Sequence, residues 1–503
     1  MTSFTKIPDE ERPVISVDAT HTIARIEANT YGGFTEHMGR CIYGGIYDPG
    51  NPLSDENGFR TDVIKAMKDL NVPVVRYPGG NFVATYHWLD GVGPREKRPK
   101  RHDLAWAGVE SNQFGTDEFL KWCEIVGTEP YFALNFGTGT LDEALAWVEY
   151  CNSDADTFYA NLRRQNGREK PYKVKYWALG NEMWGPWQVG QMTKEAYADK
   201  AYQWAKALKL LDPSIVLILC GETGYSSWDS YVIKECIRYD LHGLGGSTTA
   251  SLIDMHSIHI YTASDDHLKN VTAPRSAERA IQIAASLIDL ARIENKVPHT
   301  VPRQKICFDE WNVWDPQRAP GEKGAEEAYT LSDALAVAVW LNVFVRQAEH
   351  IGMANIAQSV NVISPLMTTK EGIVKQPPWW PLVLFSKYMR GQSLAVNVRC
   401  GEYEGQTSPG WIRGTVETPW LDVSAALQDN GVVSLAVVNI TENRAIETQL
   451  KGIPAGAKVE VHKVTGKSVL ERDAGISKED ITWPSSHCFE FPAASLTLLR
   501  YKP

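Results

Sequence analysis

Two stretches of the sequence end an apolar run with a glutamate. In YWALGNEMWG the run YWALG is followed by Asn181 and Glu182, and in KICFDEWNVW the run KICF is followed by Asp309 and Glu310. A carboxylate that directly follows a buried strand is costly unless it meets a partner or solvent in a cleft. Glycoside hydrolysis uses two such carboxyl groups, one protonated to donate to the leaving oxygen and one ionised to attack or stabilise the sugar.

The elements that must position these glutamates are strands and helices in alternation. Short apolar runs alternate with segments such as DEFLKWCEIVG and LDEALAWVEYC, whose apolar residues recur at three- and four-residue spacing. Strands that are apolar throughout belong to a parallel sheet buried on both faces. The pattern therefore predicts an α/β fold, a (β/α)8 TIM barrel. Its predicted strands are 30–34, 74–77, 131–136, 174–179, 215–220, 254–261, 305–308 and 354–359.

The carboxyl ends of barrel strands are where chemistry collects, because the βα loops converge there. The fourth and seventh strands carry Glu182 and Glu310, and they face each other across the ring. Any single polar side chain at a strand end is as well explained by a salt bridge or a capped loop, but the whole group favours a site. Its members are Glu36, Arg76, Asn81, Asn135, Asn181, Glu182, Glu222, His259, Tyr261, Asp309, Glu310 and Gln358.

Aromatic residues are interleaved with these polar groups. A sugar ring stacks its C–H faces on aromatic rings, while its hydroxyls need donors and acceptors. The combination predicts a carbohydrate site. The aromatic residues concerned are Trp88, Trp106, Trp184, Trp187, Trp311 and Trp314.

The last part of the chain has a different sequence pattern. Short β-rich runs such as VVSLAVVNI, KVEVHKV and SLTLLRY are separated by turn residues and show little helical period. We expect a catalytic barrel over 29–391 and a C-terminal β-sandwich over 392–503. The opening RPVISVDATHTIARI is also strand-like, so strands from 1–28 are expected to complete the sandwich.

Several motifs together resemble one known family. YGGFTEHMGRCIYGGIYDP, VVRYPGGNF, HWLDGVGPRE, NQFGTDEFLKWC, YWALGNEMWGPWQ and FDEWNVW occur in this order. They resemble the α-L-arabinofuranosidases of glycoside hydrolase family 51, which are retaining barrel glycosidases. The resemblance covers nearly the whole chain. It implies an exo-acting enzyme that removes terminal α-L-arabinofuranosyl residues from arabinan, arabinoxylan or derived oligosaccharides, and a homo-oligomer, a hexamer in this family.

The resemblance also implies roles for individual residues. Glu182, in Gly-Asn-Glu, matches the general acid/base, and Glu310, in Asp-Glu-Trp-Asn, matches the nucleophile. Trp314 matches part of the wall of the arabinose pocket, and His259 is placed with the substrate-binding group at the end of its strand. The other residues implied to line the pocket are Glu36, Arg76, Asn81, Asn181, Tyr261 and Gln358.

Charge and distance expectations follow from these roles. The carboxyl groups of Glu182 and Glu310 should lie about 5 to 5.5 Å apart, the spacing of a retaining enzyme. Arg76 should keep Glu310 ionised, while burial and the opposing charge should keep Glu182 protonated.

Other functions stay open at this point. Another retaining activity of the same clan, such as a β-xylosidase or an endoglucanase, is the main alternative. A catalytically dead carbohydrate-binding protein is a second, although it would be expected to have lost one of the two glutamates. His256 and His259 have no third ligand at a matching spacing, so we expect no metal and no cofactor.

Composition limits the partners and the compartment. The chain has 503 residues, 43% hydrophobic, with a formal net charge of -10 that argues against nucleic acid or an anionic membrane as the main partner. The start MTSFTKIPDEERP lacks the apolar core of a secretory leader, and no segment reaches about 18 apolar residues. We expect a cytoplasmic protein, or an extracellular one exported by a route that the sequence does not show. The eight scattered cysteines are expected to be free thiols.

Overall fold

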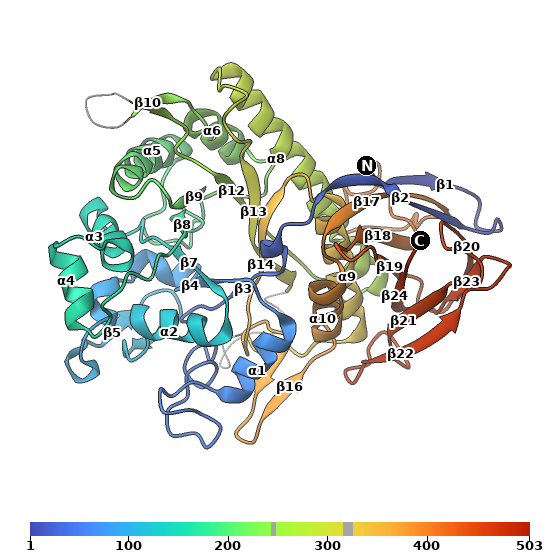
Figure 1. Cartoon of the computed structure of the whole chain (residues 1–503), viewed down its shortest axis with the longest axis horizontal. Helices are drawn as coiled ribbons and strands as arrows, with labels where there is room; N and C mark the ends of the chain where they lie inside the picture. The colour runs from blue at the N-terminus through green and yellow to red at the C-terminus, as the bar shows by residue number, and fades with distance from the viewer. Residues whose placement is uncertain (243–247, 315–324) are drawn as a thin grey trace.

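The computed structural model describes residues 1–242, 248–314 and 325–503. It contains a barrel and a separate sheet domain, with the helices α9 (Leu331–Arg346) and α10 (Trp379–Tyr388) between them (Figure 1). Both chain termini lie in the sheet domain (Figure 1). Of the described helices, none is both long enough and apolar enough to span a bilayer.

An eight-stranded parallel sheet forms the barrel. A bridge between Gly32 and Asn355 joins the first strand region to the last, so the ring is nearly closed. This arrangement confirms the predicted (β/α)8 barrel. In ring order the strands are β3 (Gly33–Phe34), β4 (Val74–Tyr77), β7 (Glu129–Ala133), β8 (Tyr176–Leu179), β9 (Val216–Leu219), β12 (Met255–Thr262), β13 (Lys305–Val313) and β14 (Ile351–Ile356).

Several barrel strands differ in their bounds from the prediction, and two of the differences bear on the site. The strand expected over 305–308 continues as β13 to Val313, because residues up to Val313 pair with β12. The polar residues that seemed to end the strand are therefore part of it. The strand expected over 30–34 is only β3, because a 3-10 turn, η1 (Ala28–Tyr31), occupies the preceding residues.

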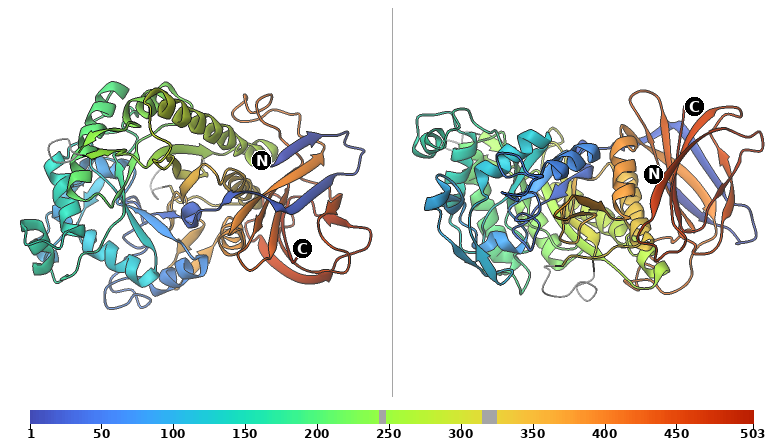
Figure 2. Two further views of the ribbon diagram at one scale, coloured as in Figure 1. Left: turned by 45° about the horizontal axis from the view of Figure 1, so that its top comes forward. Right: turned by 90° about the horizontal axis from the view of Figure 1, so that it is seen from below.

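Helices surround the barrel (Figures 1 and 2). Their ends follow local sequence signals: the Thr140 hydroxyl accepts a hydrogen bond from the Glu143 backbone at the start of α3, and Gly127, with φ of 83°, ends α2. Besides α9 and α10, these helices are α1 (Thr61–Leu70), α2 (Thr116–Val126), α3 (Leu141–Asn152), α4 (Phe158–Gln165), α5 (Lys194–Leu211), α6 (Ser227–Cys236), α7 (His267–Thr272) and α8 (Arg275–Glu294).

The second domain is a ten-stranded sheet folded around its own apolar core. Its N-terminal members β1 (Ser3–Lys6) and β2 (Val14–Arg25) both pair with β17 (Gln392–Cys400). The two ends of the chain therefore meet in one sheet. The remaining strands are β18 (Leu421–Leu427), β19 (Val433–Asn439), β20 (Ile446–Lys451), β21 (Lys458–Thr465), β22 (Gly475–Thr482), β23 (Cys488–Phe491) and β24 (Ser495–Tyr501).

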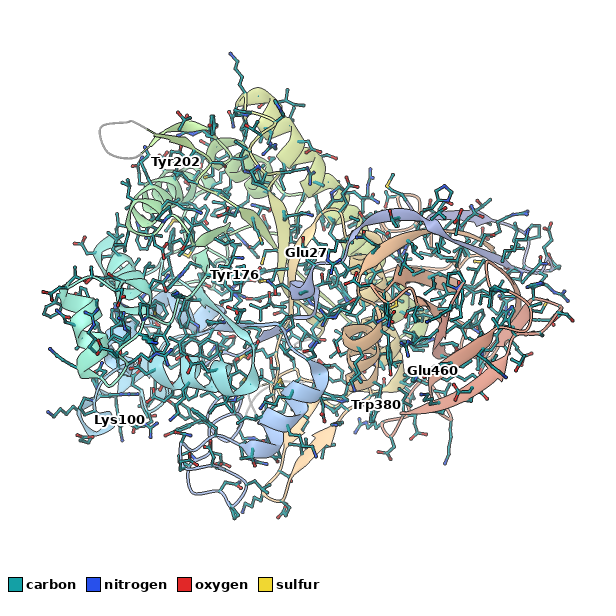
Figure 3. All side chains as sticks on the ribbon, in the orientation of Figure 1. Glu27, Lys100, Tyr176, Tyr202, Trp380 and Glu460 are labelled. Atoms are coloured by element: carbon teal, nitrogen blue, oxygen red, sulfur yellow. The ribbon has the colours of Figure 1, made fainter. Side chains whose placement is uncertain are left out.

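Buried polar contacts join the two domains. Nη1 of Arg346, on α9, donates to Oδ1 of Asp422, on β18, at 2.9 Å, and Nη2 of Arg346 donates to Glu278 of α8 at 2.9 Å. Trp380, on α10, donates its indole N–H to the carbonyl oxygen of Ala474 at 3.0 Å (Figure 3). All eight cysteines are free thiols, as the sequence predicts.

In the described part of the chain, three two-stranded hairpins extend from the barrel. They are formed by β5 (Arg101–Asp103) with β6 (Gly108–Glu110), β10 (Asp240–His242) with β11 (Thr248–Ala250), and β15 (Leu366–Thr368) with β16 (Ile373–Lys375). The basic run that includes Lys100 leads into the first hairpin at the outer edge of the barrel (Figure 3). There Arg98 is paired with Glu118 and Arg101 with Asp90, so part of its positive charge is neutralised within the protein.

Candidate active site

Glu182 lies directly beyond the carboxyl end of β8. Gly180 has a φ of 90° and Glu182 a φ of 43°, and the left-handed conformation costs a residue with a Cβ about 1–3 kcal/mol. Oε1 of Glu182 lies 3.0 Å from Nδ1 of His259, and Oε2 accepts a hydrogen bond of 2.8 Å from Nε1 of Trp187. The backbone turn and these two contacts fix the direction of the carboxyl group.

Glu310 lies within β13, where it is in register with His259 of β12. Nη1 of Arg76 donates to Oε1 of Glu310 at 2.6 Å, and the hydroxyl of Tyr261 donates to Oε2 at 2.8 Å. The Glu310 side chain is 8% exposed. Hydrogen bonds to a charged acceptor in such a site are strong, so these two donors orient the carboxylate and stabilise its negative charge.

The two glutamates face each other across the barrel mouth. One side-chain atom each from Glu182, His259 and Glu310 lie within 4.8 Å of one another. One imidazole and two carboxylates could in principle hold a metal ion. The guanidinium of Arg76, 2.6 Å from Glu310, would repel a second cation, so the spacing suits two reacting carboxyl groups better.

Arg76, at the end of β4, connects both sides of the site. Its Nη2 donates to Oδ1 of Asn181 at 2.6 Å, and its Nε lies 3.5 Å from Oδ2 of Asp309. Asp309 also lies 3.0 Å from Nε2 of His259. Arg76 is only 1% exposed, so these partners, in place of water, must stabilise its positive charge. Removing one partner of a buried ion pair destabilises a protein by about 3–5 kcal/mol.

Glu36 follows β3 and is held by three donors. Oε1 accepts hydrogen bonds from the Trp106 indole at 3.0 Å and from the Phe82 backbone at 3.1 Å. Oε2 accepts from Nε2 of Gln358 at 2.9 Å, while Oε1 of Gln358 accepts from the Glu36 backbone at 3.1 Å. A Cβ added at Gly79 would lie 2.8 Å from Cγ of Glu36, so the chain must have glycine there.

The positive charge of His259 shifts the pKa of Glu182. Burial lowers the pKa of His259, but the charges of Glu310 and Asp309 outweigh burial and raise this pKa to about 10. Burial raises the pKa of Glu182, but the hydrogen bond and charge of His259 outweigh it and leave this pKa below its usual value. The prediction from the sequence that Glu182 is protonated is therefore wrong. The reason is the His259 cation 3.0 Å from Glu182, which the sequence alone does not reveal.

Two further titratable groups are shifted by the same charges. Burial and then the negative charge of Glu310 raise the pKa of Glu36 to about 7. Burial raises the pKa of Asp309, but the positive charges of Arg76 and His259 outweigh it and hold this pKa below its usual value. The site thus holds carboxyl groups in contrasting environments, as acid/base catalysis requires.

The structure brings the remaining predicted residues to the same end of the barrel with different contacts. Asn181 uses its Oδ1 for Arg76, and its Nδ2 donates to Gln188 at 3.2 Å. The backbone oxygen of Asn81 accepts from Gln188 at 3.3 Å. The ring of Trp314 packs edge-on against Tyr261, with centroids 5.1 Å apart.

Some predicted neighbours lie outside the site. Trp88 packs on Trp147 in the barrel wall, and Trp311 packs on Trp340, so both are core residues. Asn135 donates to the backbone oxygen of Tyr86 and stabilises a loop. Their positions near strand ends could not distinguish a core residue from one that faces the cavity.

Other contacts in the site were not predicted from the sequence. Tyr131 lies on β7, where it looks like one more residue of a buried strand, yet its hydroxyl donates to Oδ2 of Asp309 at 2.7 Å. Gln188 bonds to both Asn181 and Asn81. No local pattern indicates these contacts, because Tyr131 and Asp309 lie on different strands and Gln188 reaches Asn81 from a different loop.

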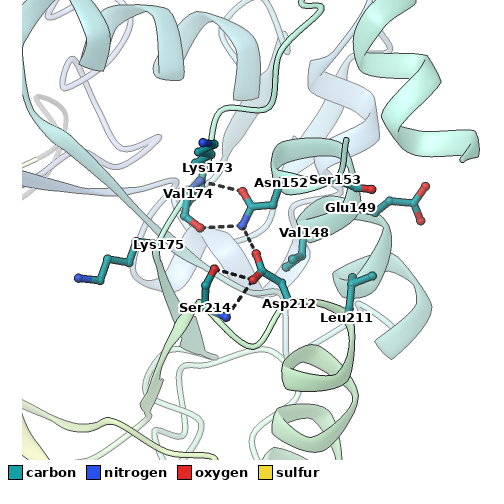
Figure 4. A pocket seen from close by; sticks show the side chains of 10 residues that line it. All are labelled: Val148, Glu149, Asn152, Ser153, Lys173, Val174, Lys175, Leu211, Asp212 and Ser214. Atoms are coloured by element: carbon teal, nitrogen blue, oxygen red, sulfur yellow. Dashed lines mark hydrogen bonds between the residues drawn. The ribbon is translucent and has the colours of Figure 1, made fainter. Parts of the chain in front are cut away.

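A pocket of about 600 Å³ lies away from this site, next to the amino ends of β8 and β9. Three of its polar side chains bond to one another. Nδ2 of Asn152 donates to Oδ2 of Asp212 at 2.8 Å, and Oδ1 of Asp212 accepts from the Ser214 hydroxyl at 2.6 Å (Figure 4). Barrel enzymes place their chemistry at the opposite end, so we assign this pocket a structural role.

Comparisons with known proteins agree with this geometry. Residues 66–279 match the family described as "Alpha-L-arabinofuranosidase 1 domain", and residues 309–487 match "Alpha-L-arabinofuranosidase C-terminal domain". The chain is 66% identical to "Probable alpha-L-arabinofuranosidase C" of Aspergillus terreus over all of both chains. It is 37% identical to "Intracellular exo-alpha-(1->5)-L-arabinofuranosidase" of Halalkalibacterium halodurans over 86% of each.

A solved structure is similar over the same length. The GH51 α-L-arabinofuranosidase from Thermotoga petrophila RKU-1 superposes with a TM-score of 0.86 at 36% sequence identity, covering 97% of this chain and 99% of that one. Both the barrel and the sheet domain are therefore shared with that enzyme.

Proposed function

Because this chain belongs to the α-L-arabinofuranosidases of glycoside hydrolase family 51, we propose that it is a retaining, exo-acting member. It would release terminal non-reducing α-L-arabinofuranosyl residues by double displacement. Its substrates would be arabinan, arabinoxylan or oligosaccharides derived from them.

The spacing of Glu182 and Glu310 carries the proposal of retention. Their nearest ligand atoms lie within 4.8 Å of each other. Retaining enzymes place their two carboxyl groups about 5–5.5 Å apart, whereas inverting enzymes need about 6.5–9.5 Å to fit a water between nucleophile and sugar. The short separation supports direct attack by a carboxylate.

In the first step, a carboxylate oxygen of Glu310 forms a bond to the anomeric carbon of arabinofuranose. The glycosidic C–O bond breaks, and the proton of Glu182 passes to the leaving oxygen. Arg76 and Tyr261 donate to the two oxygens of Glu310 and hold it in line for attack. The proton that Glu182 transfers can come from His259, 3.0 Å away, before the bond breaks, and it can return to His259 after the second step.

In the second step, Glu182 removes a proton from water as the water oxygen bonds to the anomeric carbon. The ester bond to Glu310 breaks, and both carboxyl groups return to their starting states. Two inversions at one carbon give net retention of configuration.

The proposed arabinose pocket lies between Glu310 and Glu36. A Cβ added at Gly80 would lie 3.1 Å from Oε1 of Glu310 and 3.4 Å from Oε2 of Glu36, so these carboxyl groups share one wall. Trp106 bonds to Glu36, which gives that wall an aromatic edge. The exo mode draws support from the Halalkalibacterium halodurans relative, whose name includes this mode and the α-(1→5) linkage.

The test is turnover of an aryl α-L-arabinofuranoside beside an aryl β-xyloside, with the first product anomer identified by NMR. We expect the arabinofuranoside to be preferred and the α anomer to form first. A β first product would refute retention, and preference for the xyloside would favour a β-xylosidase. Activity against internal β-glucan bonds would favour an endoglucanase. Lack of any turnover, with sugar binding retained, would favour a carbohydrate-binding protein.

We also propose that the enzyme is a hexamer in solution, as the family resemblance implies. Light scattering after size-exclusion chromatography measures this directly. A monomer mass at micromolar concentration would contradict it.

A further inference from the structure

The leaving-group side of the site is marked by two tryptophans after β8. Trp187 donates its indole N–H to the carboxyl group of Glu182, and Trp187 is 54% exposed. Trp184 packs edge-on against Trp187, with ring centroids 5.2 Å apart. Since Glu182 is proposed to protonate the leaving oxygen, the sugar chain released in the first step must begin beside Trp187.

The contacts continue from these tryptophans to the next barrel loop. Nε1 of Trp184 donates to the backbone oxygen of Gly221 at 2.9 Å. Gly221 opens the loop between β9 and α6, and this loop also carries Tyr225. Tyr225 is 41% exposed.

The second domain supplies the next ring. Trp411 packs edge-on against Tyr225, with centroids 5.7 Å apart. Trp411 lies in residues 401–420, which connect the antiparallel strands β17 and β18. Such neighbours usually need a hairpin of about 2–5 residues, and a much longer connection is usually functional.

This connection is anchored so that Trp411 is held in place. Ile412, the next residue, is fully buried. The backbone oxygen of Glu417 accepts a hydrogen bond of 2.9 Å from Arg275 of α8. A partly exposed aromatic ring on an anchored loop is a preorganised surface for binding.

We propose that Tyr225 and Trp411 form a distal subsite for the leaving sugar chain, which makes the second domain part of the substrate-binding surface. The ligand is a neutral sugar ring at least two positions beyond the cleaved bond. Neutral rings suit this surface because their C–H faces stack on aromatic side chains. This inference rests on the proposed exo-arabinofuranosidase function, since that function fixes the side on which the chain leaves.

The dependence of kcat/KM on the length of the leaving sugar chain tests the subsite. The substrates are an aryl α-L-arabinofuranoside, α-(1→5)-arabino-oligosaccharides of two to four sugars, and arabinose-substituted xylo-oligosaccharides. For the wild type we expect kcat/KM to rise about tenfold with the length of the leaving chain in at least one oligosaccharide series. Trp411→Ala should lose most of this gain and keep the rate on the aryl glycoside within about twofold. The oligosaccharide series in which kcat/KM rises with chain length identifies the polysaccharide, arabinan or arabinoxylan, that the subsite binds.

The matched control is Phe158→Ala, which removes a ring that is 75% exposed on the outer helix α4. It should keep the full dependence on chain length. Three results would each overturn the proposal. They are equal losses on aryl and oligosaccharide substrates, no loss in Trp411→Ala, and wild-type turnover that does not change with chain length. Thermal unfolding of each variant checks that the fold is kept.

A binding measurement separates this inference from the proposed function. Calorimetry with the four-sugar substrates of both series is made on Glu310→Ala and on the double variant with Trp411→Ala. We expect the double variant to bind the preferred series about tenfold more weakly. Weaker binding together with no turnover by the wild type would leave the subsite standing and refute the proposed function. Equal binding by the two variants would refute the subsite.

Discussion

Replacing His259 by glutamine removes the positive charge between three carboxylates and keeps a hydrogen-bond donor. The pKa of His259 is about 10 in the folded protein, against 6.5 for the free side chain. A raised pKa contributes stability that is fully present below pH 6.5 and is lost as pH rises through 10. The difference of about 3.5 units, at about 1.36 kcal/mol per unit, is on the order of 5 kcal/mol.

The expected stability effect has a definite pH dependence. Wild type should exceed His259→Gln in free energy of unfolding by several kcal/mol at about pH 6. That difference should shrink as pH rises from 6.5 toward 10. Urea denaturation at a series of pH values measures it. A difference that stays constant or grows with pH would refute the charge assigned to His259.

The same substitution should change the pH profile of catalysis. A unit charge 3.0 Å from Glu182, at an effective dielectric constant of about 20, interacts by roughly 5–6 kcal/mol, an upper limit before solvent and Arg76 are considered. Without this charge, burial raises the pKa of Glu182. The alkaline limb of kcat/KM on an aryl arabinofuranoside should therefore move upward by about one pH unit or more.

The control for this experiment is His256→Gln. His256 also lies buried on β12, but its Nε2 lies 2.8 Å from Asp229 instead of a catalytic glutamate. The control should leave the alkaline limb in place. An unmoved or lower limb in His259→Gln, or an equal shift in the control, would show that the proposed charge coupling is wrong.

Four further substitutions test the assigned roles. Glu182→Ala should lose about 10²- to 10⁴-fold in kcat on natural substrates and much less on activated aryl glycosides, and azide should rescue it to the α-arabinofuranosyl azide, identified by NMR. Glu310→Ala should abolish hydrolysis of all substrates, and added azide should give the β-arabinofuranosyl azide with this variant. Azides of the same configuration from both variants would contradict these assignments. Arg76→Lys keeps the charge but not the planar fork, so kcat should fall about 10²-fold in steady-state assays, and a near-normal kcat would contradict this. Gly79→Ala should raise KM about tenfold or more, because its Cβ would lie 2.8 Å from Cγ of Glu36, and an unchanged KM would contradict the close approach.

Local sequence patterns were sufficient for the barrel and for the two candidate carboxylates. A buried strand is a continuous apolar run, and a charged residue at its end must face solvent or a partner, so Glu182 and Glu310 could be found without coordinates. The same reasoning predicted too short a range for β13. It treated Asp309 and the residues after it as a loop, although they continue the strand beside β12.

Contacts between distant segments could not be obtained in this way. The direction of the pKa shift of Glu182 depends on His259, which is 77 positions later in the chain. The hydroxyl of Tyr131 reaches Asp309 across 178 positions. Electrostatic energies depend on distances of a few ångströms, and such distances are fixed only when the strands close into a ring.

The sequence by itself determined the alternating elements, the strand-end glutamates and the family, because each depends on residues close together in the chain or on motifs in a fixed order. The tertiary structure alone decided which carboxyl group has a cation beside it, which tryptophans are core, and that Trp411 of the second domain meets Tyr225 of the barrel. Those outcomes depend on packing between elements, which local periodicity does not encode.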